Sequence, residues 1–299
     1  MRRPAAVLAL AALLSVTACS TGGGGSDGSD DPRSTTTEAG GGETTTSTTT
    51  DQPSDGDADQ AVIDSVDATL ENPAFSVKSE ANLNVGVQTF QLTTDGSIDY
   101  DALIADAEIT IDGGKGQQGG IKILSDGSKL WINATGDTGV TLPAGKSWVE
   151  GSSDLLSSSD NFAPVDLIGV IVALRGAKDT EVGDTKDIDG VETQEYSTTL
   201  TYDEAVAAAG EDAAAFKSAL SLTSEDPVDL DIDVWIGDDG IIRRFELEVD
   251  APSGVPLGGD YTVELGSIGD EIDAPDAPPA AQVLTGPEAD KILDQLISS

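Results

Sequence analysis

The strongest constraint on the fold of this 299-residue chain is a repeated alternation of apolar and polar side chains. Between Phe75 and Val87 the apolar residues stand at odd-numbered positions, which places them on one face of an extended strand. Similar alternations recur up to Leu265, separated by turn sequences such as SDGS and, at Gly237–Gly240, GDDG. The pattern predicts about eight or nine antiparallel strands, each with one apolar and one charged face.

Helical periodicity interrupts this alternation in a few places. We expect helices over about residues 58–71, over Ala163–Leu174 and over Asp203–Leu220, and an amphipathic segment at the end of the chain. Because so few helices must cover the apolar face of the sheet, the economical arrangement is a sheet that curves around them. The expected fold class is α+β, a curved antiparallel β-sheet half-barrel with helices packed on its concave face.

The first 19 residues predict export and a lipid anchor. Arg2 and Arg3 precede an apolar run from Ala5 to Leu14, which is typical of a secretory signal peptide and shorter than the about 20 residues of a membrane span. The run leads to Val-Thr-Ala-Cys, which looks like a bacterial lipobox. Cleavage by signal peptidase II after residue 18 would leave Cys19 as a lipidated N-terminus, with an ordinary signal peptide and an incidental cysteine as the alternative.

The residues that follow are expected to be a tether. Residues 19–57 contain the lipidated Cys19 and then mainly Gly, Ser, Thr, Asp and Pro, a composition that buries too little apolar area to fold. A random coil of this length spans roughly 30–40 Å. We therefore assign residues 1–18 to the signal peptide and 58–299 to one folded domain, held by diacylglycerol at the extracytoplasmic face of the cell membrane.

Composition excludes several classes of function. The net charge is −40, with 55 acidic and 15 basic residues, which argues against nucleic acid as a partner because nucleic acid needs a basic patch. The chain has no histidine and one cysteine, so Ser-His-Asp and Cys-His catalysis and His- or Cys-based zinc and copper sites are excluded. We expect no enzyme activity, no cofactor and no metal. The acidity is interpreted as a soluble surface, with cation binding as the alternative.

The alternation also indicates which side chains line the concave face. They are mostly Val, Ile, Leu and Ala, which would form a smooth lining without directional donors, better suited to an acyl chain than to a sugar or an amino acid. A filled core is the alternative, because the same pattern is what folds a sheet. The candidate lipid-binding residues are Val77, Leu83, Val85, Phe90, Leu92, Ile109, Ile111, Ile121, Ile123, Leu130, Ile132, Ile168, Ile171, Leu230, Ile232, Val234, Phe245 and Leu247.

Two stretches are similar to segments of a known lipoprotein family. Val228–Asp250 contains a strand ending in Val-Trp-Ile, an acidic turn with glycine and an Arg-Arg return strand, and Asp187–Ala205 is a strand that leads into a helix. With the lipobox and the order of elements, they resemble the LppX/LprAFG lipoproteins. The resemblance implies a half-barrel close in shape to the Lol lipoprotein carriers, an apolar cavity for acylated lipids or glycolipids, and a link to lipid transport through the envelope.

Three functions remain in competition at this point. The leading hypothesis is a membrane-anchored, monomeric, extracytoplasmic lipoprotein that binds acylated lipid or glycolipid in an apolar cavity and takes part in envelope lipid transport. The alternative is a non-catalytic envelope interaction or scaffolding module with a filled core. A carboxylate enzyme such as a glycosidase needs two facing carboxylates in a cleft, and the many acidic residues neither identify nor exclude such a pair.

Overall fold

The computed structural model describes residues 55–85, 88–113, 118–136, 141–156, 167–210, 213, 216, 228–250 and 257–297. The expected signal peptide, Cys19 and nearly all of the expected tether lie outside these residues. None of the helices in the described ranges is long and apolar enough to cross a membrane.

The strands of the described residues form one 12-stranded sheet. Their spatial order is β12-β6-β5-β4-β3-β2-β1-β11-β10-β9-β8-β7, and they pair antiparallel except for β12 and β6. The strands are β1 (Ala74–Val85), β2 (Gln88–Asp99), β3 (Ile104–Asp112), β4 (Gln118–Asp126), β5 (Lys129–Gly136), β6 (Trp148–Ser152), β7 (Glu181–Ile188), β8 (Val191–Thr201), β9 (Asp229–Gly237), β10 (Ile242–Asp250), β11 (Leu257–Gly266) and β12 (Val283–Leu284).

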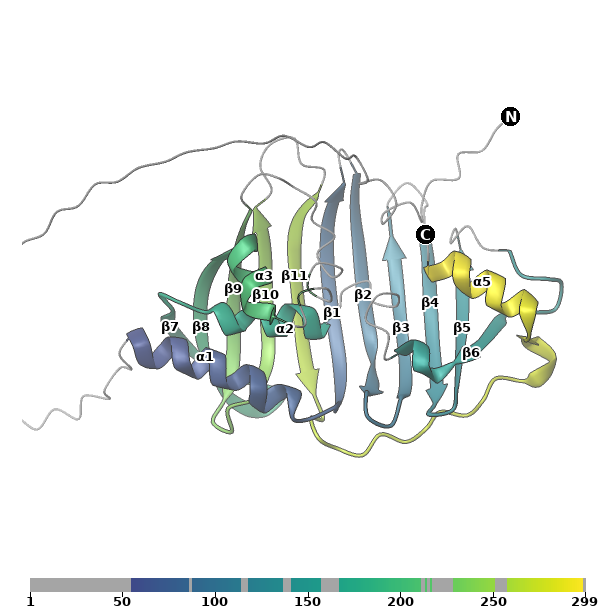
Figure 1. Cartoon of the computed structure of the whole chain (residues 1–299), viewed down its shortest axis with the longest axis horizontal. Helices are drawn as coiled ribbons and strands as arrows, with labels where there is room; N and C mark the ends of the chain where they lie inside the picture. Colours follow the sequence, from purple (N-terminus) through teal and green to yellow (C-terminus); the bar gives the residue numbers. More distant parts are fainter. Residues whose placement is uncertain are drawn as a thin grey trace, which may run out of the picture.

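The helices of the described residues cover one face of the sheet, in two groups (Figure 1). Helices α1, α2 and α3 lie over the half made by β7–β11, and α5 lies over the other half, near β4–β6. This open, curved sheet with a few helices on its concave face confirms the expected α+β half-barrel. The helical elements are α1 (Asp55–Leu70), η1 (Ser153–Leu156), α2 (Leu167–Ala173), η2 (Leu174–Gly176), α3 (Tyr202–Ala209), η4 (Ala280–Gln282) and α5 (Pro287–Ile297).

The expected number of strands was too low. β6 and β12 are short, and β7 leaves nearly all of its side chains exposed, so none of the three shows a long apolar alternation. The chain around Thr94, which resembles a turn in sequence, continues instead as the middle of the single strand β2. The three additional strands enlarge the sheet and leave its predicted architecture unchanged.

The helix expected over Asp203–Leu220 is interrupted after Ala209; Ala213 and Phe216 are again helical, and the other residues from 211 to 220 lie outside the described residues. Helix α3 begins after Thr201 and ends at Ala209, where Gly210 takes a positive φ of 57°. Thr201 and Glu204 form a capping box, in which the Thr201 hydroxyl accepts from the Glu204 amide and the Glu204 carboxylate accepts from the Thr201 amide. The Lys178 ammonium and these Thr201 hydrogen bonds lower the pKa of Glu204 to about 2, so the cap is charged at neutral pH.

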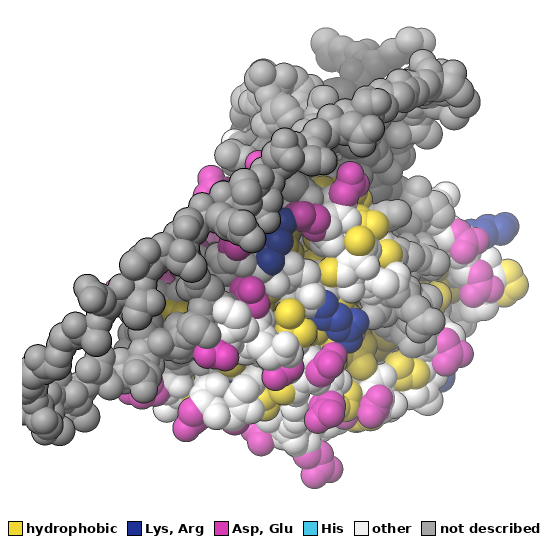
Figure 2. Space-filling view, turned by 60° about the vertical axis from the view of Figure 1, so that its left-hand side comes forward, with side chains coloured by type: hydrophobic (Ala, Val, Ile, Leu, Met, Phe, Trp, Pro, Cys, Tyr) yellow, Lys and Arg dark blue, Asp and Glu magenta, His cyan; other side chains and the backbone are white. Residues whose placement is uncertain are grey.

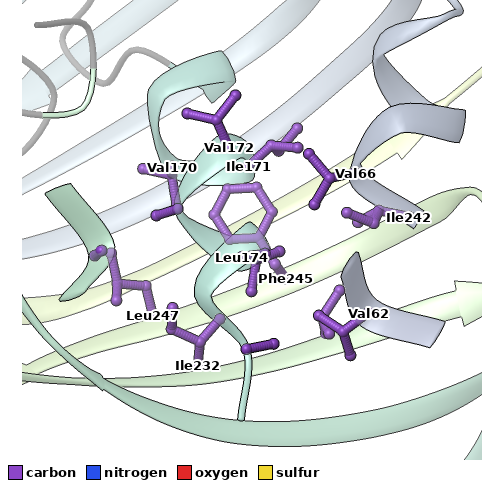
Figure 3. Packing of buried hydrophobic residues seen from close by; sticks show 14 of the residues in the cluster. Val62, Val66, Val170, Ile171, Val172, Leu174, Ile232, Ile242, Phe245 and Leu247 are labelled. Atoms are coloured by element: carbon purple, nitrogen blue, oxygen red, sulfur yellow. The ribbon is translucent and has the colours of Figure 1, made fainter. Parts of the chain in front are cut away.

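The largest of three hydrophobic clusters in the described residues, here the large cluster, joins helices α1–α3 to strands β8–β11. In Figure 3 the ring of Phe245 lies beneath α2, with Val66 of α1 beside it. Val170 and Ile171 are each 1% exposed, so α2 is itself part of the core. The large cluster comprises Val62, Val66, Phe75, Val170, Ile171, Val172, Ala173, Leu174, Ala177, Leu200, Ala205, Ala209, Phe216, Val228, Leu230, Ile232, Val234, Ile236, Ile242, Phe245, Leu247, Val263 and Leu265.

A second core, here the small cluster, joins α5 to strands β3–β6. Helix α5 supplies one apolar stripe to it, as the C-terminal periodicity predicts. The strand β12 and the segment before it close the sheet edge at β6, where the Ser147 amide and the Lys146 ammonium donate to carbonyls of Gln282 and Val283. The small cluster comprises Ile109, Ile123, Leu130, Ile132, Val149, Leu284, Ala289, Ile292 and Leu293.

The convex face of the sheet carries the charges. Along one row from β10 to β2 the charges alternate in sign, because Lys78 of β1 stands opposite Glu264 on one side and Asp95 on the other. Farther along the same row, Arg244 pairs with Glu264 and lies 5.3 Å from the ring of Trp235. Acidic groups still dominate the surface, as Figure 2 shows for one side of the molecule. The scarce cations are therefore placed where they neutralise acidic neighbours on adjacent strands.

Another row of the convex face has no such compensation. Glu248 of β10 stands directly opposite Asp231 on β9 and Asp260 on β11, and all three are exposed. Like charges directly opposite each other destabilise a sheet, so Glu248→Gln is expected to raise the free energy of unfolding by about 0.2–1 kcal/mol. Urea unfolding in low salt measures the gain, which should vanish in 1 M salt, where the screening length is about 3 Å.

The matched control for this prediction is Glu264→Gln. Glu264 stands opposite Lys78 and Arg244 in the alternating row, so the same loss of a carboxylate removes attraction there and should destabilise. Equal effects of the two variants would contradict the assignment of repulsion to the Glu248 row.

Candidate functional site: the central strip of the concave face

Between the two clusters, strands β1–β4 present side chains that are only partly buried. In Figure 1 these strands lie between the group α1–α3 and helix α5. Register partners stand on the same face of a sheet, so the pairing fixes which residues share the concave side. We call the partly exposed set the central strip. It comprises Val77, Ser79, Leu92, Thr94, Gly96, Ala107, Ile111, Ile121 and Tyr261.

The side chains in the middle of the central strip are small, so they project little from the sheet. One register row runs from Val77 through Gly96 and Ala107 to the buried Ile123. A Cβ at Gly96 would lie 2.5 Å from the Cα of Ala107, so no larger residue fits there without moving the backbone of β3. The concave surface between the large cluster and the small cluster therefore consists of backbone and small side chains.

No charged residue occupies a concave position of β1–β4 or β11. The concave side of β2, for example, carries Phe90, Leu92, Thr94, Gly96 and Ile98, while the charged residues of this strand, Asp95 and Asp99, point to the convex side. In a chain of net charge −40, this separation of charged residues on the convex face from uncharged residues on the concave face is pronounced. The central strip is consequently an uncharged, mostly apolar surface that is partly open to solvent.

The structure divides the predicted lining residues between the two clusters instead of gathering them in one place. Ile171, Leu230, Ile232, Val234, Phe245 and Leu247 are buried in the large cluster, and Val77 packs against it. Ile109, Ile123, Leu130 and Ile132 are buried in the small cluster, and Ile111 and Ile121 pack against that one. Phe90 is 6% exposed and Leu92 is partly exposed. The side chains of Leu83, Val85 and Ile168 lie outside the described residues.

Three hydroxyl groups on this face were missed by reasoning from the apolar pattern alone. Ser79 lies between the apolar Val77 and Ala81 at an odd-numbered position, so its parity could have placed it on the concave face. Thr94 stands opposite Ser79 in the register, and Tyr261 stands opposite Ala81. The expectation of a lining without directional donors is therefore wrong, because polar residues within an alternating strand follow the same parity as their apolar neighbours.

The acidic side chains form no metal site in the described part of the chain. No group of three or more acidic or cysteine side chains there is arranged to hold a metal ion. On strands β9–β11 the acidic side chains stand on the convex face, away from the central strip.

Comparison with solved structures gives likenesses with low identity and TM-scores below 0.5. The Mycobacterium tuberculosis lipoprotein LppX is 16% identical, with a TM-score of 0.44 over 74% of this chain and 100% of that one. LprF from Mycobacterium bovis is 14% identical, with a TM-score of 0.44 over 73% and 96% of the two chains. MucB is 12% identical, with a TM-score of 0.29 over 78% and 64%. These likenesses concern the fold alone. The sequence matches no family model and no curated protein.

Proposed function

We propose that this chain is a membrane-anchored, extracytoplasmic lipoprotein that binds an acylated lipid or glycolipid on its concave face and takes part in envelope lipid transport. The observation that carries the proposal is the central strip, where apolar side chains such as Val77, Leu92 and Ile111 stay partly exposed between the large and small clusters. The resemblance of the sequence motifs to the LppX/LprAFG lipoproteins supports the same function.

An acyl chain is the ligand that this surface suits best. Each methylene buried against apolar side chains contributes about 0.8 kcal/mol. A sugar or an amino acid would instead bring many polar groups that need buried partners, and an ionic ligand would need a countercharge that the uncharged concave face lacks. The same absence of charged side chains speaks for a non-catalytic role.

The N-terminal sequence supports an anchored carrier. A diacylglycerol on Cys19 would hold the protein at the membrane, and the Gly/Thr-rich segment up to residue 57 would let the domain reach roughly 30–40 Å from it. The domain would then work as a monomer, with one concave face for one ligand.

The test of lipid binding changes two residues that face each other across β2 and β3. Leu92 and Ile111 are register partners on the central strip and are both partly exposed. Leu92→Asn with Ile111→Asn removes apolar contact worth about 1.5–3 kcal/mol per fully buried side chain, so affinity should fall by about tenfold or more. Native mass spectrometry of the purified full chain, followed by solvent extraction, measures the bound acylated species.

The control uses the next register pair on the opposite face. Thr93 and Thr110 are partners, exposed on the convex side, so Thr93→Asn with Thr110→Asn changes the same strands without touching the strip. This control should keep its lipid. If the wild-type chain carries no lipid and takes up none from a diverse set, the carrier proposal is wrong and an envelope interaction module takes its place.

A further inference from the structure

We propose that the hydroxyl groups of Tyr261, Ser79 and Thr94 form a polar station on the central strip that binds the ester carbonyls of an acylated lipid. The inference rests on the proposed function, because it names the part of the lipid that this point of the strip recognises. It also predicts a property that an apolar surface alone would not have, which is discrimination between lipids with equal chains and different linkages.

The register of three strands brings the hydroxyl groups together. Tyr261 on β11 stands opposite Ala81 of β1, which makes Ser79, two residues earlier on β1, its diagonal neighbour on the same face. Such diagonal pairs lie within reach of an aromatic side chain, and the Tyr261 hydroxyl makes a hydrogen bond with Ser79. Thr94 on β2 stands directly opposite Ser79. The three residues therefore form a short row of hydroxyls across β11, β1 and β2.

The surroundings of this row are apolar on both sides. Toward the large cluster, the ring of Tyr261 lies 6.0 Å from that of Phe245, and Ser79 faces Val263. Toward the small cluster, Thr94 faces Ile109. An oxygen atom of a ligand held on this face would find its hydrogen-bond donors at this row, with apolar surface for chains extending away from it in either direction.

The phenol of Tyr261 is suited to donate a hydrogen bond. Burial raises its pKa well above the ordinary value, although the hydrogen bond with Ser79 opposes the shift, so the hydroxyl keeps its proton at physiological pH. Serine and threonine hydroxyls also donate and accept without carrying charge. An uncharged set of donors fits the carbonyl of an ester, whereas a phosphate or a carboxylate would call for a cation.

The experiment compares two lipids that differ only in linkage. Dioleoylglycerol has two ester carbonyls, and dioleylglycerol ether has the same chains without carbonyl oxygens. The full chain is titrated with each lipid as wild type and as the double variant Tyr261→Phe, Ser79→Ala. We expect the double variant to lose about tenfold in affinity for the ester, because two hydroxyls are removed, and less than about twofold for the ether.

Two further variants keep the test decisive. Tyr202→Phe removes a hydroxyl from a partly buried tyrosine of α3 that stacks on Phe216, outside the central strip, and should leave both affinities unchanged. Thr94→Val removes the third hydroxyl at nearly constant volume and should selectively weaken ester binding even if the double variant folds poorly. Equal losses of affinity for the two lipids, or no loss of affinity for the ester, would overturn the polar station and leave the proposed function in place. A wild-type chain that binds neither lipid overturns the proposed function and this inference together.

Discussion

Phe245→Ala is expected to lower the free energy of unfolding by about 3–5 kcal/mol, the range for removing a large aromatic ring from a packed core. Phe245 is 0% exposed and lies at the centre of the large cluster, beneath α2 (Figure 3). It stands opposite Val234 on one side and Val263 on the other, so its ring touches the middle of the β8–β11 half. Collapse of the neighbours into the cavity is limited, because both partners belong to paired strands.

Urea unfolding of the variant measures this loss, and hydrogen exchange locates it. The exchange protection should fall most in α1–α3 and β8–β11, because the large cluster joins those elements. Leu130→Ala is the companion variant, since Leu130 is also 0% exposed but lies in the small cluster with α5. Leu130→Ala should lower the free energy of unfolding by about 2–5 kcal/mol. The loss of hydrogen-exchange protection should then lie mainly in β3–β6. A cost below about 1 kcal/mol for Phe245→Ala would show that the cluster is not a tightly packed core.

The alternation of side chains predicts the face of each residue more reliably than it predicts the boundaries of the strands. Parity along β1 correctly places Phe75 and Ala81 on the covered side, because consecutive side chains must point to opposite faces. The same argument fails for β7, whose side chains are nearly all exposed at the edge of the sheet. It also fails for β12, which is too short for any pattern. An apolar alternation appears in a sequence only where a strand buries one face, and β7 and β12 bury few side chains.

The position of the central strip could not be derived from the sequence for a different reason. Whether an inward residue is core or open surface depends on which helix covers it, and that is a long-range property. Ile232 and Leu92 show the same alternation, yet Ile232 is buried in the large cluster and Leu92 stays partly exposed. The hydroxyl row likewise needs the β1–β11 register, which joins the first strand of the sheet to a strand near the end of the chain.

The second large effect is expected at Cys19, where substitution should abolish lipid attachment. In the proposed lipoprotein, the thioether of Cys19 carries two acyl chains, and each buried methylene contributes about 0.8 kcal/mol to membrane binding. No single side chain of the folded domain contributes on that scale. Cys19→Ala in the full chain should therefore remove the whole lipid mass from the N-terminal peptide, as measured by mass spectrometry of the protein from its native type of host.

A neighbouring variant distinguishes loss of the anchor from a general defect in export. Ser20→Ala changes the residue after the cleavage site and leaves the thiol in place, so its N-terminal peptide should begin at Cys19 and carry the diacylglycerol mass. The wild-type chain should behave in the same way and remain with the membrane fraction. An unmodified Cys19 in the exported wild-type protein would contradict the anchor and leave an ordinary secreted half-barrel. The central strip lies on the folded domain, and Cys19 precedes that domain in the sequence. The test of lipid binding with Leu92 and Ile111 therefore does not depend on whether Cys19 is lipidated.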